Sequence, residues 1–218
     1  MRMRKKKHGA QRLEACGEIL LSKPSKPIAA SGEIFGRDGE LRLEIGCGKG
    51  GFACGMSEKY PDANFIALER VDDVMVVAVE KAMLAKERRS TDNLRFMIAR
   101  AEDLSEIFEK SSVDVIYLNF SDPWPKKGHA KRRLTYRTFL TSYFSILKAG
   151  GKLCFKTDNR GLFDFTLEEL DALGVSCDYV TYDLHSSEYA SDNVMTEYET
   201  NFSSQGIPIC ALSLTNKK

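Results

Sequence analysis

Apolar runs that suit β-strands alternate with segments that suit α-helices through most of this 218-residue chain. The strand pattern occurs at 41–46, 64–69, 94–99, 113–120 and 152–156. The spacing of apolar residues between and after these runs predicts helices at 50–59, 72–89, 102–109, 140–147 and 161–172. Such alternation with short connections is typical of a parallel sheet with helices on both faces.

The two ends of the chain depart from this alternation. Residues 10–22 are a candidate helix, and 23–40, with its glycines and prolines, predicts a loop. Near the C-terminus, strands at 175–184 and 207–214 are separated by a polar loop instead of a crossover helix, so they can pair antiparallel at one sheet edge.

We therefore expect a Rossmann-like α/β fold, with a seven-stranded, mostly parallel sheet that has one antiparallel edge strand and helices on both faces. This domain would span 41–218, after a basic N-terminal tail, a short helix and a loop in 1–40.

The composition fits one compact domain, with 43% hydrophobic and 29% charged residues. The six cysteines include no CxxC pair and no secretory apolar segment follows the N-terminus, which indicates free thiols in a reducing cytoplasm. No apolar stretch approaches the roughly 20 residues that a membrane span needs. The three histidines are far apart and have no cysteine at ligand spacing, so we expect no metal site.

The formal net charge of +1 conceals two basic segments. The first is a terminal run, which favours a solvated tail, and it comprises Arg2, Arg4, Lys5, Lys6 and Lys7. The second contains no acid and follows the strand pattern at 113–120; its cations are Lys126, Lys127, Lys131, Arg132, Arg133 and Arg137. Cations close to the carboxyl end of a strand suit the binding of phosphate groups.

The segment LEIGCGKGGF at 43–52 runs from a predicted strand through glycines into a predicted helix. Gly46 and Gly48, on either side of Cys47, allow a tight turn and a close approach of the backbone to a ligand. We therefore expect a cofactor at this turn, although a GxG turn by itself is also compatible with a purely structural role.

Two carboxylates narrow the choice of cofactor. Glu69 ends the next strand, where an acidic side chain accepts hydrogen bonds from the hydroxyls of a ribose, as in NAD or S-adenosylmethionine. Glu44 lies inside the strand before the turn, a costly place for a carboxylate without a partner. Its charge suits the cationic and amine groups of S-adenosylmethionine and would repel the pyrophosphate of NAD.

Four segments in order resemble those of one enzyme family. The glycine turn and the acids beside it resemble the class I methyltransferases. NFSDPWPKKGHAKRRL at 119–134, KTDN at 156–159 and TEYE at 196–199 resemble the bacterial tRNA guanine-N7 methyltransferase family. The resemblance covers nearly the whole chain and implies a Rossmann-like class I methyltransferase that forms 7-methylguanosine, with the tRNA variable loop as target.

The resemblance also implies a set of site residues. Those for S-adenosylmethionine, with S-adenosylhomocysteine as product and no metal, are Glu44, Gly46, Cys47, Gly48, Glu69, Arg100 and Asp122. Those for tRNA are Lys126, Asp158, Thr196, Glu197, Tyr198 and Glu199. No membrane and no obligatory protein partner are expected, and the protein would act as a monomer or homodimer.

The chemistry of guanine N7 gives the carboxylates a role of their own. N7 carries a lone pair and attacks a sulfonium methyl group without losing a proton, so no general base is required. Catalysis then depends on positioning and on the electrostatic field around a cation that moves from sulfur to the purine. We assign the central catalytic role to Asp122 and leave guanine recognition open among Asp122, Asp158, Glu197 and Glu199.

The roles of several neighbouring residues remain open. Trp124 can stack on a base or pack under its loop, and Arg132 and Arg133 can hold phosphates or brace acidic groups of the fold. His129 is more readily a backbone or phosphate contact than a catalyst.

Two residues depart from the family pattern. Gly128 replaces an arginine that many relatives carry, which removes one phosphate contact. Arg100 stands where an aspartate usually accepts a hydrogen bond from the adenine amino group, and arginine cannot accept it. Glu102 or Asp103 could substitute, or backbone groups alone could bind the adenine.

Other functions are weighed against this one. The main alternative is an S-adenosylmethionine-dependent methyltransferase of another RNA or of a small molecule, although a small-molecule enzyme has little use for the cations of 126–137. A binding protein without catalysis is disfavoured because all the motif acids are present. An NAD oxidoreductase is disfavoured by Glu44.

Overall fold

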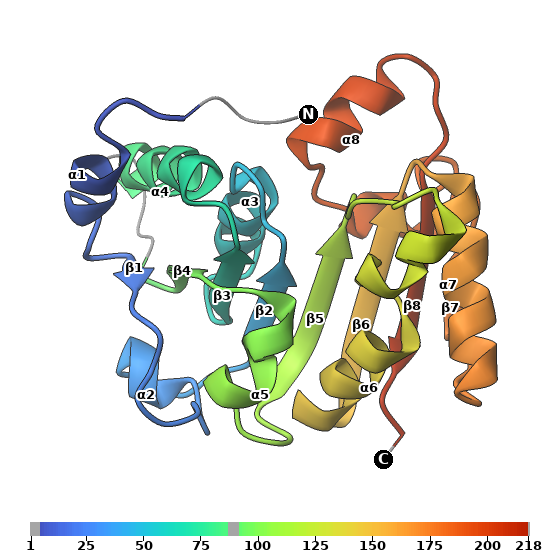
Figure 1. The fold of residues 1–218 in the computed structure, drawn as a ribbon, viewed down its shortest axis with the longest axis horizontal. Coiled ribbons are helices and arrows are strands. Elements are labelled where there is room, and N and C mark those ends of the chain that lie inside the picture. The colour runs from blue at the N-terminus through green and yellow to red at the C-terminus, as the bar shows by residue number, and fades with distance from the viewer. Residues whose placement is uncertain (1–4, 87–91, 218) are drawn as a thin grey trace.

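The computed structural model describes residues 5–86 and 92–217 and contains a single sheet. In the described residues the sheet has eight strands in the order β1-β4-β3-β2-β5-β6-β8-β7 (Figure 1). The strands are β1 (Leu20–Leu21), β2 (Leu41–Ile45), β3 (Asn64–Glu69), β4 (Leu94–Ile98), β5 (Val113–Asn119), β6 (Leu147–Thr157), β7 (Tyr179–Thr181) and β8 (Cys210–Thr215).

Helices connect these strands and cover both faces of the sheet. The α-helices are α1 (Gly9–Glu14), α2 (Gly32–Phe35), α3 (Gly51–Lys59), α4 (Asp72–Lys86), α5 (Leu104–Ile107), α6 (Arg137–Ile146), α7 (Arg160–Ala172) and α8 (Glu197–Ser203). The described part of the chain also contains the short 3-10 helices η1 (Ala101–Asp103), η2 (Lys127–Arg132) and η3 (Glu188–Asp192). The predicted end of the second helix at 89 lies outside the described residues.

The core consists of two main clusters, one on each face of the sheet. Helices α5, α6 and α7 pack on one face, and α3 and α4 pack on the other. In β5, Ile116 and Leu118 point to the first cluster while Val115 and Tyr117 point to the second. This alternation follows from the two-residue period of a strand and explains why β5 carries apolar side chains on both of its faces.

The fold prediction is confirmed, with one additional strand. Strands β1 to β6 pair in parallel, and β8 pairs antiparallel with both β6 and β7, as expected for the last two strands. Because β8 lies between β6 and β7, the edge of the sheet is the three-residue strand β7, which is shorter than the predicted 175–184.

The N-terminal predictions were partly wrong. The helix predicted over 10–22 ends at Glu14, and Leu20 and Leu21 form β1, which pairs parallel with β4. Apolar residues alone do not distinguish a short helix from a short edge strand. Helix α2 lies within the predicted loop at 23–40. In the basic N-terminal run, Arg2 and Arg4 lie outside the described residues, and the backbone N–H of Lys6 donates to Asp73 Oδ1 at 2.6 Å.

Two further boundaries differ from the sequence pattern. Helix α6 ends at Ile146, and the glycines at 150 and 151 lie inside the long strand β6, where the register with β5 shifts. The predicted polar loop between the last strands contains η3 and α8. Within the described ranges, no helix is long and apolar enough to cross a membrane.

Candidate active site

The turn after β2 leaves a space at the carboxyl edge of the sheet. Gly46 and Gly48 have φ angles of 80° and 56°, which favour glycine, and a Cβ at either position would meet no atom within 4 Å. The backbone N–H groups of Gly46 and Cys47 donate to the carbonyl of Leu68 at the end of β3. The turn is therefore fixed to the sheet by its hydrogen bonds to Leu68, and the space next to Gly46 and Gly48 is free for a ligand.

Glu69 ends β3 and is fixed by backbone donors. One carboxylate oxygen accepts from the N–H of Gly48 at 3.2 Å, and the other accepts from the N–H groups of Arg70 and Val71 at 2.8 and 3.0 Å. A carboxylate has about four acceptor positions, so acceptor capacity remains for further donors such as ribose hydroxyls.

Glu44 is a buried carboxylate with an unused oxygen. Its side chain points to the α3 face of the sheet, where Oε1 accepts from Asn119 Nδ2 at 2.9 Å. Oε2 is buried and has no hydrogen-bond partner among the described residues. Burial raises the pKa of Glu44 to about 7, against the opposing effects of Asn119 and Lys156. A buried acceptor without a donor beside a glycine turn fits a ligand that carries an ammonium or amine group.

Cys47 lies in the glycine turn, and its backbone N–H donates to the carbonyl of Leu68. Its side chain is buried, and burial raises the pKa of the thiol well above its usual range, so the sulfur is neutral. Arg100, which follows β4, is exposed, and its backbone N–H donates to Asp103 Oδ2 at 3.3 Å. One of the two acids that could replace the missing aspartate is thus engaged in the first turn of η1.

The loop after β5 carries Asp122 on a strained backbone. Phe120 and Trp124, on either side of it, have φ angles of 50° and 41°, a region that costs non-glycine residues on the order of 1–3 kcal/mol each. The Asp122 side chain is 70% exposed, and Oδ2 lies 3.6 Å from an Arg70 guanidinium nitrogen. Ser121 Oγ is buried and has no partner among the described residues. Strain of this kind concentrates at functional sites.

Arginines of the second basic segment hold this loop. The Arg133 guanidinium donates to the carbonyls of Pro123 and Trp124 at 3.0 and 3.1 Å. Arg133 therefore braces the loop through backbone carbonyls, whereas the open interpretations named phosphates or acidic groups. Arg132 lies 5.0 Å from the centre of the Trp124 ring, and His129 meets that ring edge-on at 5.7 Å. Trp124 is therefore packed by its own loop, although part of the ring remains accessible.

The other cations of this segment divide into two groups. Arg137 is engaged in a pair with the buried Glu169, and its guanidinium also lowers the pKa of that carboxyl. The cations that are exposed on and around η2 are Lys126, Lys127, Lys131 and Arg132. These side chains form the positively charged surface beside Asp122, and we refer to them below as the η2 cations.

The segment 193–199 lies at the same edge of the sheet, where α8 begins beyond the ends of β5 and β6 (Figure 1). Thr196 caps α8, since its hydroxyl accepts from the N–H of Glu199 at 2.9 Å. Tyr198 is 59% exposed, and Glu197 pairs with Lys81 of α4. Asp158, at the end of β6, is half-buried and precedes the cap of α7.

Glu199 differs from the other predicted tRNA residues because it is fully buried. Its oxygens accept from Lys156, His185 and Asn193. These three residues were not singled out from the sequence. The T-x-x-E spacing of 196–199 is a capping-box pattern and could have predicted the start of α8.

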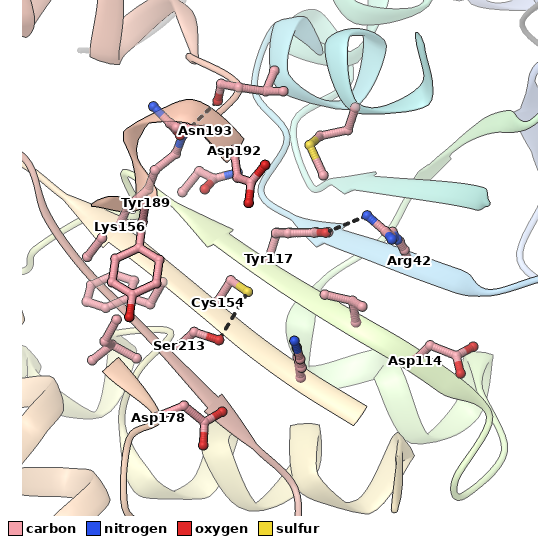
Figure 2. Close-up of a pocket in the computed structure, with 18 of the residues that line it drawn as sticks. Arg42, Asp114, Tyr117, Cys154, Lys156, Asp178, Tyr189, Asp192, Asn193 and Ser213 are labelled. Carbon is pink, nitrogen blue, oxygen red and sulfur yellow. Dashed lines mark hydrogen bonds between the residues drawn. The ribbon is translucent and has the colours of Figure 1, made fainter. Parts of the chain in front are cut away.

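A cavity of about 690 Å³ extends below this edge, on the α3 face of β5, β6 and β8 (Figure 2). Several of its polar side chains are paired within the protein. Arg42 donates to Tyr117 and Glu40, Cys154 Sγ lies 3.7 Å from Ser213 Oγ, and Lys156 binds Asn193. Within 5–86 and 92–217, no cluster of three or more potential metal ligands is present.

A family model described as "Putative methyltransferase" matches residues 38–212. Among solved structures, an antibiotic-related methyltransferase has a TM-score of 0.61 at 19% identity and covers 88% of this chain and 97% of its own. The 16S rRNA methyltransferase KamB has a TM-score of 0.60 at 15% identity, with 81% of this chain and 87% of its own covered. These structures establish the class I methyltransferase fold.

Curated relatives are much more similar in sequence. The tRNA (guanine-N(7)-)-methyltransferase of Lysinibacillus sphaericus (strain C3-41) is 44% identical over 212 residues, which is 97% of this chain and 96% of the relative. The enzyme of the same name from Streptococcus agalactiae serotype III (strain NEM316) is 42% identical over 206 residues, 94% and 95% of the two chains. The chain therefore belongs to the tRNA (guanine-N(7)-)-methyltransferase family.

Proposed function

We propose that this protein transfers the methyl group of S-adenosylmethionine to N7 of a guanine in tRNA, in the variable loop, and so forms 7-methylguanosine. The observation that carries the proposal is that neighbouring parallel strands bring three features to one edge of the sheet. The strand β2 carries Glu44, whose Oε2 has no partner among the described residues, and runs into the glycine turn, while Asp122 and then the exposed η2 cations follow β5. Relatives named tRNA (guanine-N(7)-)-methyltransferase match this chain over nearly its whole length.

Four residues would hold the cofactor. Glu44 Oε2, buried and without a partner among the described residues, would accept from the amino group, and Glu69 would accept from the ribose hydroxyls. Gly46 and Gly48 would allow the backbone to approach closely. When bound, S-adenosylmethionine supplies a methyl group on a positively charged sulfur, and S-adenosylhomocysteine is the product. Its adenine would be bound near Arg100 by backbone groups or Glu102.

Asp122 would stabilise the positive charge that moves from the sulfur of the cofactor to the guanine. No proton needs to leave N7 before methyl transfer, so an exposed carboxylate on a strained loop that Arg133 braces serves by position and by its electrostatic field. Its negative charge stabilises the cation that develops on the purine, and its oxygens can accept from the N1 and N2 donors of guanine. Asp158 and Glu197 are further acceptors at the same edge.

The tRNA would lie across the η2 cations and the segment 193–199. Lys126 and its neighbours would bind phosphates, while Thr196, Tyr198 and the buried Glu199 would shape the side of the pocket that faces the base. The target guanine must leave its stacking partners, which favours a loop nucleotide over a duplex one. The free cysteines agree with a reducing cytoplasm, where tRNA is modified.

The decisive experiment uses unmodified tRNA and S-adenosylmethionine labelled on the methyl group. Digestion of the product to nucleosides should yield labelled 7-methylguanosine, and mapping should place it in the variable loop. Absence of that nucleoside, under conditions in which the Lysinibacillus relative produces it, contradicts the proposal. An rRNA fragment and a free guanine nucleotide in parallel reactions test the alternatives of another RNA and a small molecule.

A further inference from the structure

Lys156 at the end of β6 connects the sheet to the segment 193–199. Its ammonium nitrogen donates to Glu199 Oε2 at 2.5 Å, to Asn193 Oδ1 at 2.8 Å and to the carbonyl of Val194 at 2.8 Å (Figure 2 shows the contact with Asn193). All three hydrogens of the ammonium group are therefore used by one segment. The nitrogen also lies 4.9 Å from the centre of the Phe52 ring.

The Lys156–Glu199 pair is buried and satisfied on both sides. The two side chains are 7% and 0% exposed. Glu199 also accepts from His185 Nε2 at 2.9 Å and from the backbone N–H of Thr196 at 3.3 Å. Removal of one partner leaves an uncompensated charge out of contact with water, which is far more costly than loss of a surface ion pair.

The opposite side of the segment packs directly on the backbone of α3. A Cβ at Gly51 would lie 2.5 Å from the Glu197 carboxylate, and a Cβ at Gly55 would lie 2.6 Å from Val194. Gly51 and Gly55 are four residues apart and so share one face of the helix. The segment is thus held between a glycine face of α3 and the ammonium group of Lys156.

We propose that Lys156 is a positioning residue, which sets the place of the segment 193–199 over the cofactor edge and thereby the alignment of the target guanine. This inference rests on the proposed function. Helix α8 has only seven residues and would not be stable in isolation, so its position depends on its contacts with the rest of the fold, among them the Lys156–Glu199 pair. Lys156 does not touch the reacting atoms; it acts through Glu199, Asn193 and Val194.

The test compares Lys156→Met with Lys152→Met, a matched control on the same strand and the same face whose side chain is exposed. Measurements are made at pH 8.5, where the Glu44 carboxyl is mainly ionised. We expect Lys156→Met to lower kcat/KM for tRNA by roughly 100-fold, since small misplacements at a reaction centre have effects of that size. The Kd of S-adenosylmethionine should change by less than about threefold, and Lys156→Arg should recover part of the activity.

A second variant distinguishes an effect on the position of the segment 193–199 from an effect on folding. Lys156→Met/Glu199→Gln leaves no uncompensated charge, so its Tm should exceed that of Lys156→Met while kcat/KM for tRNA remains at least about tenfold below the wild type. If this double variant shows wild-type tRNA kinetics, the inference is overturned. This test remains valid even if the single variant Lys156→Met does not fold. Loss of cofactor binding in proportion to loss of tRNA activity would overturn it as well.

Hydrogen exchange gives a readout that does not depend on activity. Backbone amides of 196–203 should exchange faster in Lys156→Met than in the wild type, while amides of α3 keep their rates. Unchanged exchange at α8 contradicts the inference. A wild-type protein that does not methylate tRNA contradicts the proposed function instead, so the two failures are distinct.

Discussion

Asn119 Nδ2 donates a 2.9 Å hydrogen bond to Oε1 of Glu44, while Oε2 of the same buried carboxylate has no partner in the described part of the chain. The free protein therefore keeps a carboxyl group in a costly environment, which is expressed in its raised pKa. Two neighbouring strands, β2 and β5, provide the acid and its donor, so the geometry is set by the sheet.

The raised pKa of Glu44 predicts a pH dependence of stability. The pKa is about 7 in the folded protein and 4.5 in the unfolded chain, so the folded state binds the extra proton and loses stability as pH rises from 4.5 through 7. The contribution is about 3 kcal/mol in all. Glu44→Gln should lack this pH-dependent loss of stability. Denaturant unfolding between pH 5 and 8.5 measures the difference. Equal pH profiles of the unfolding free energy in both proteins would refute the assignment.

Substitution of Asp122 should affect turnover and leave the fold intact. The side chain is 70% exposed, so Asp122→Ala should change the free energy of unfolding by less than about 0.5 kcal/mol. We expect kcat to fall at least about 100-fold, because a charge placed for the transition state is lost. Asp164→Ala removes another aspartate that is paired with an arginine, with its side chain 44% exposed, and serves as control. Near-normal turnover of Asp122→Ala would rule out its central role.

Gly48 and Gly174 offer a matched pair of glycine substitutions. Both have left-handed φ angles, of 56° and 67°, and a Cβ at either would meet no atom within 4 Å. Alanine at each should cost about 1–2 kcal/mol of stability. Only Gly48→Ala should also weaken the binding of S-adenosylmethionine, by more than about tenfold, since a Cβ there enters the space for the cofactor. Calorimetric titration distinguishes them, and equal affinities would place the cofactor elsewhere.

The η2 cations predict a salt dependence of tRNA binding. Lys126→Ala should weaken binding of all tRNAs and reduce the slope of log K against log salt by about 1, whereas cofactor affinity stays unchanged. Lys110→Ala is the control, because Lys110 is also exposed but precedes β5 at the opposite edge of the sheet. Filter binding between about 50 and 200 mM salt makes the comparison. Identical slopes for the two variants would show that the η2 cations do not contact phosphate.

Much of the fold could be predicted because strand and helix periods are local properties. The runs at 64–69 and 113–120 coincide with β3 and β5 to within one residue, and both are apolar because helices cover both faces of the sheet. The N-terminal helix was predicted too long, since the strand β1 of two residues forms only through pairing with β4. A segment that short has no period to detect.

Part of the candidate site could likewise be predicted from local sequence, and part depends on tertiary contacts. The glycine turn, Glu44, Glu69 and Asp122 follow directly from their places at strand ends, because parallel strands bring their carboxyl ends to one edge. Residue types and spacing also determined the chain's resemblance to its family. The strain at Phe120 and Trp124 and the bracing of their loop by Arg133 depend on tertiary contacts that spacing does not encode.

The burial and pairing of Lys156 and Glu199 were decided by the tertiary structure alone. In the sequence, Lys156 lies in the KTDN segment and Glu199 is an expected tRNA contact, and 43 positions separate them. The fold places the end of β6 next to the start of α8, where Lys156 and Glu199 form a buried ion pair. Local sequence sets which backbone conformations and ligand-binding groups are present, whereas the free energy of a charge depends on the water and partners around it, which only the packed chain defines.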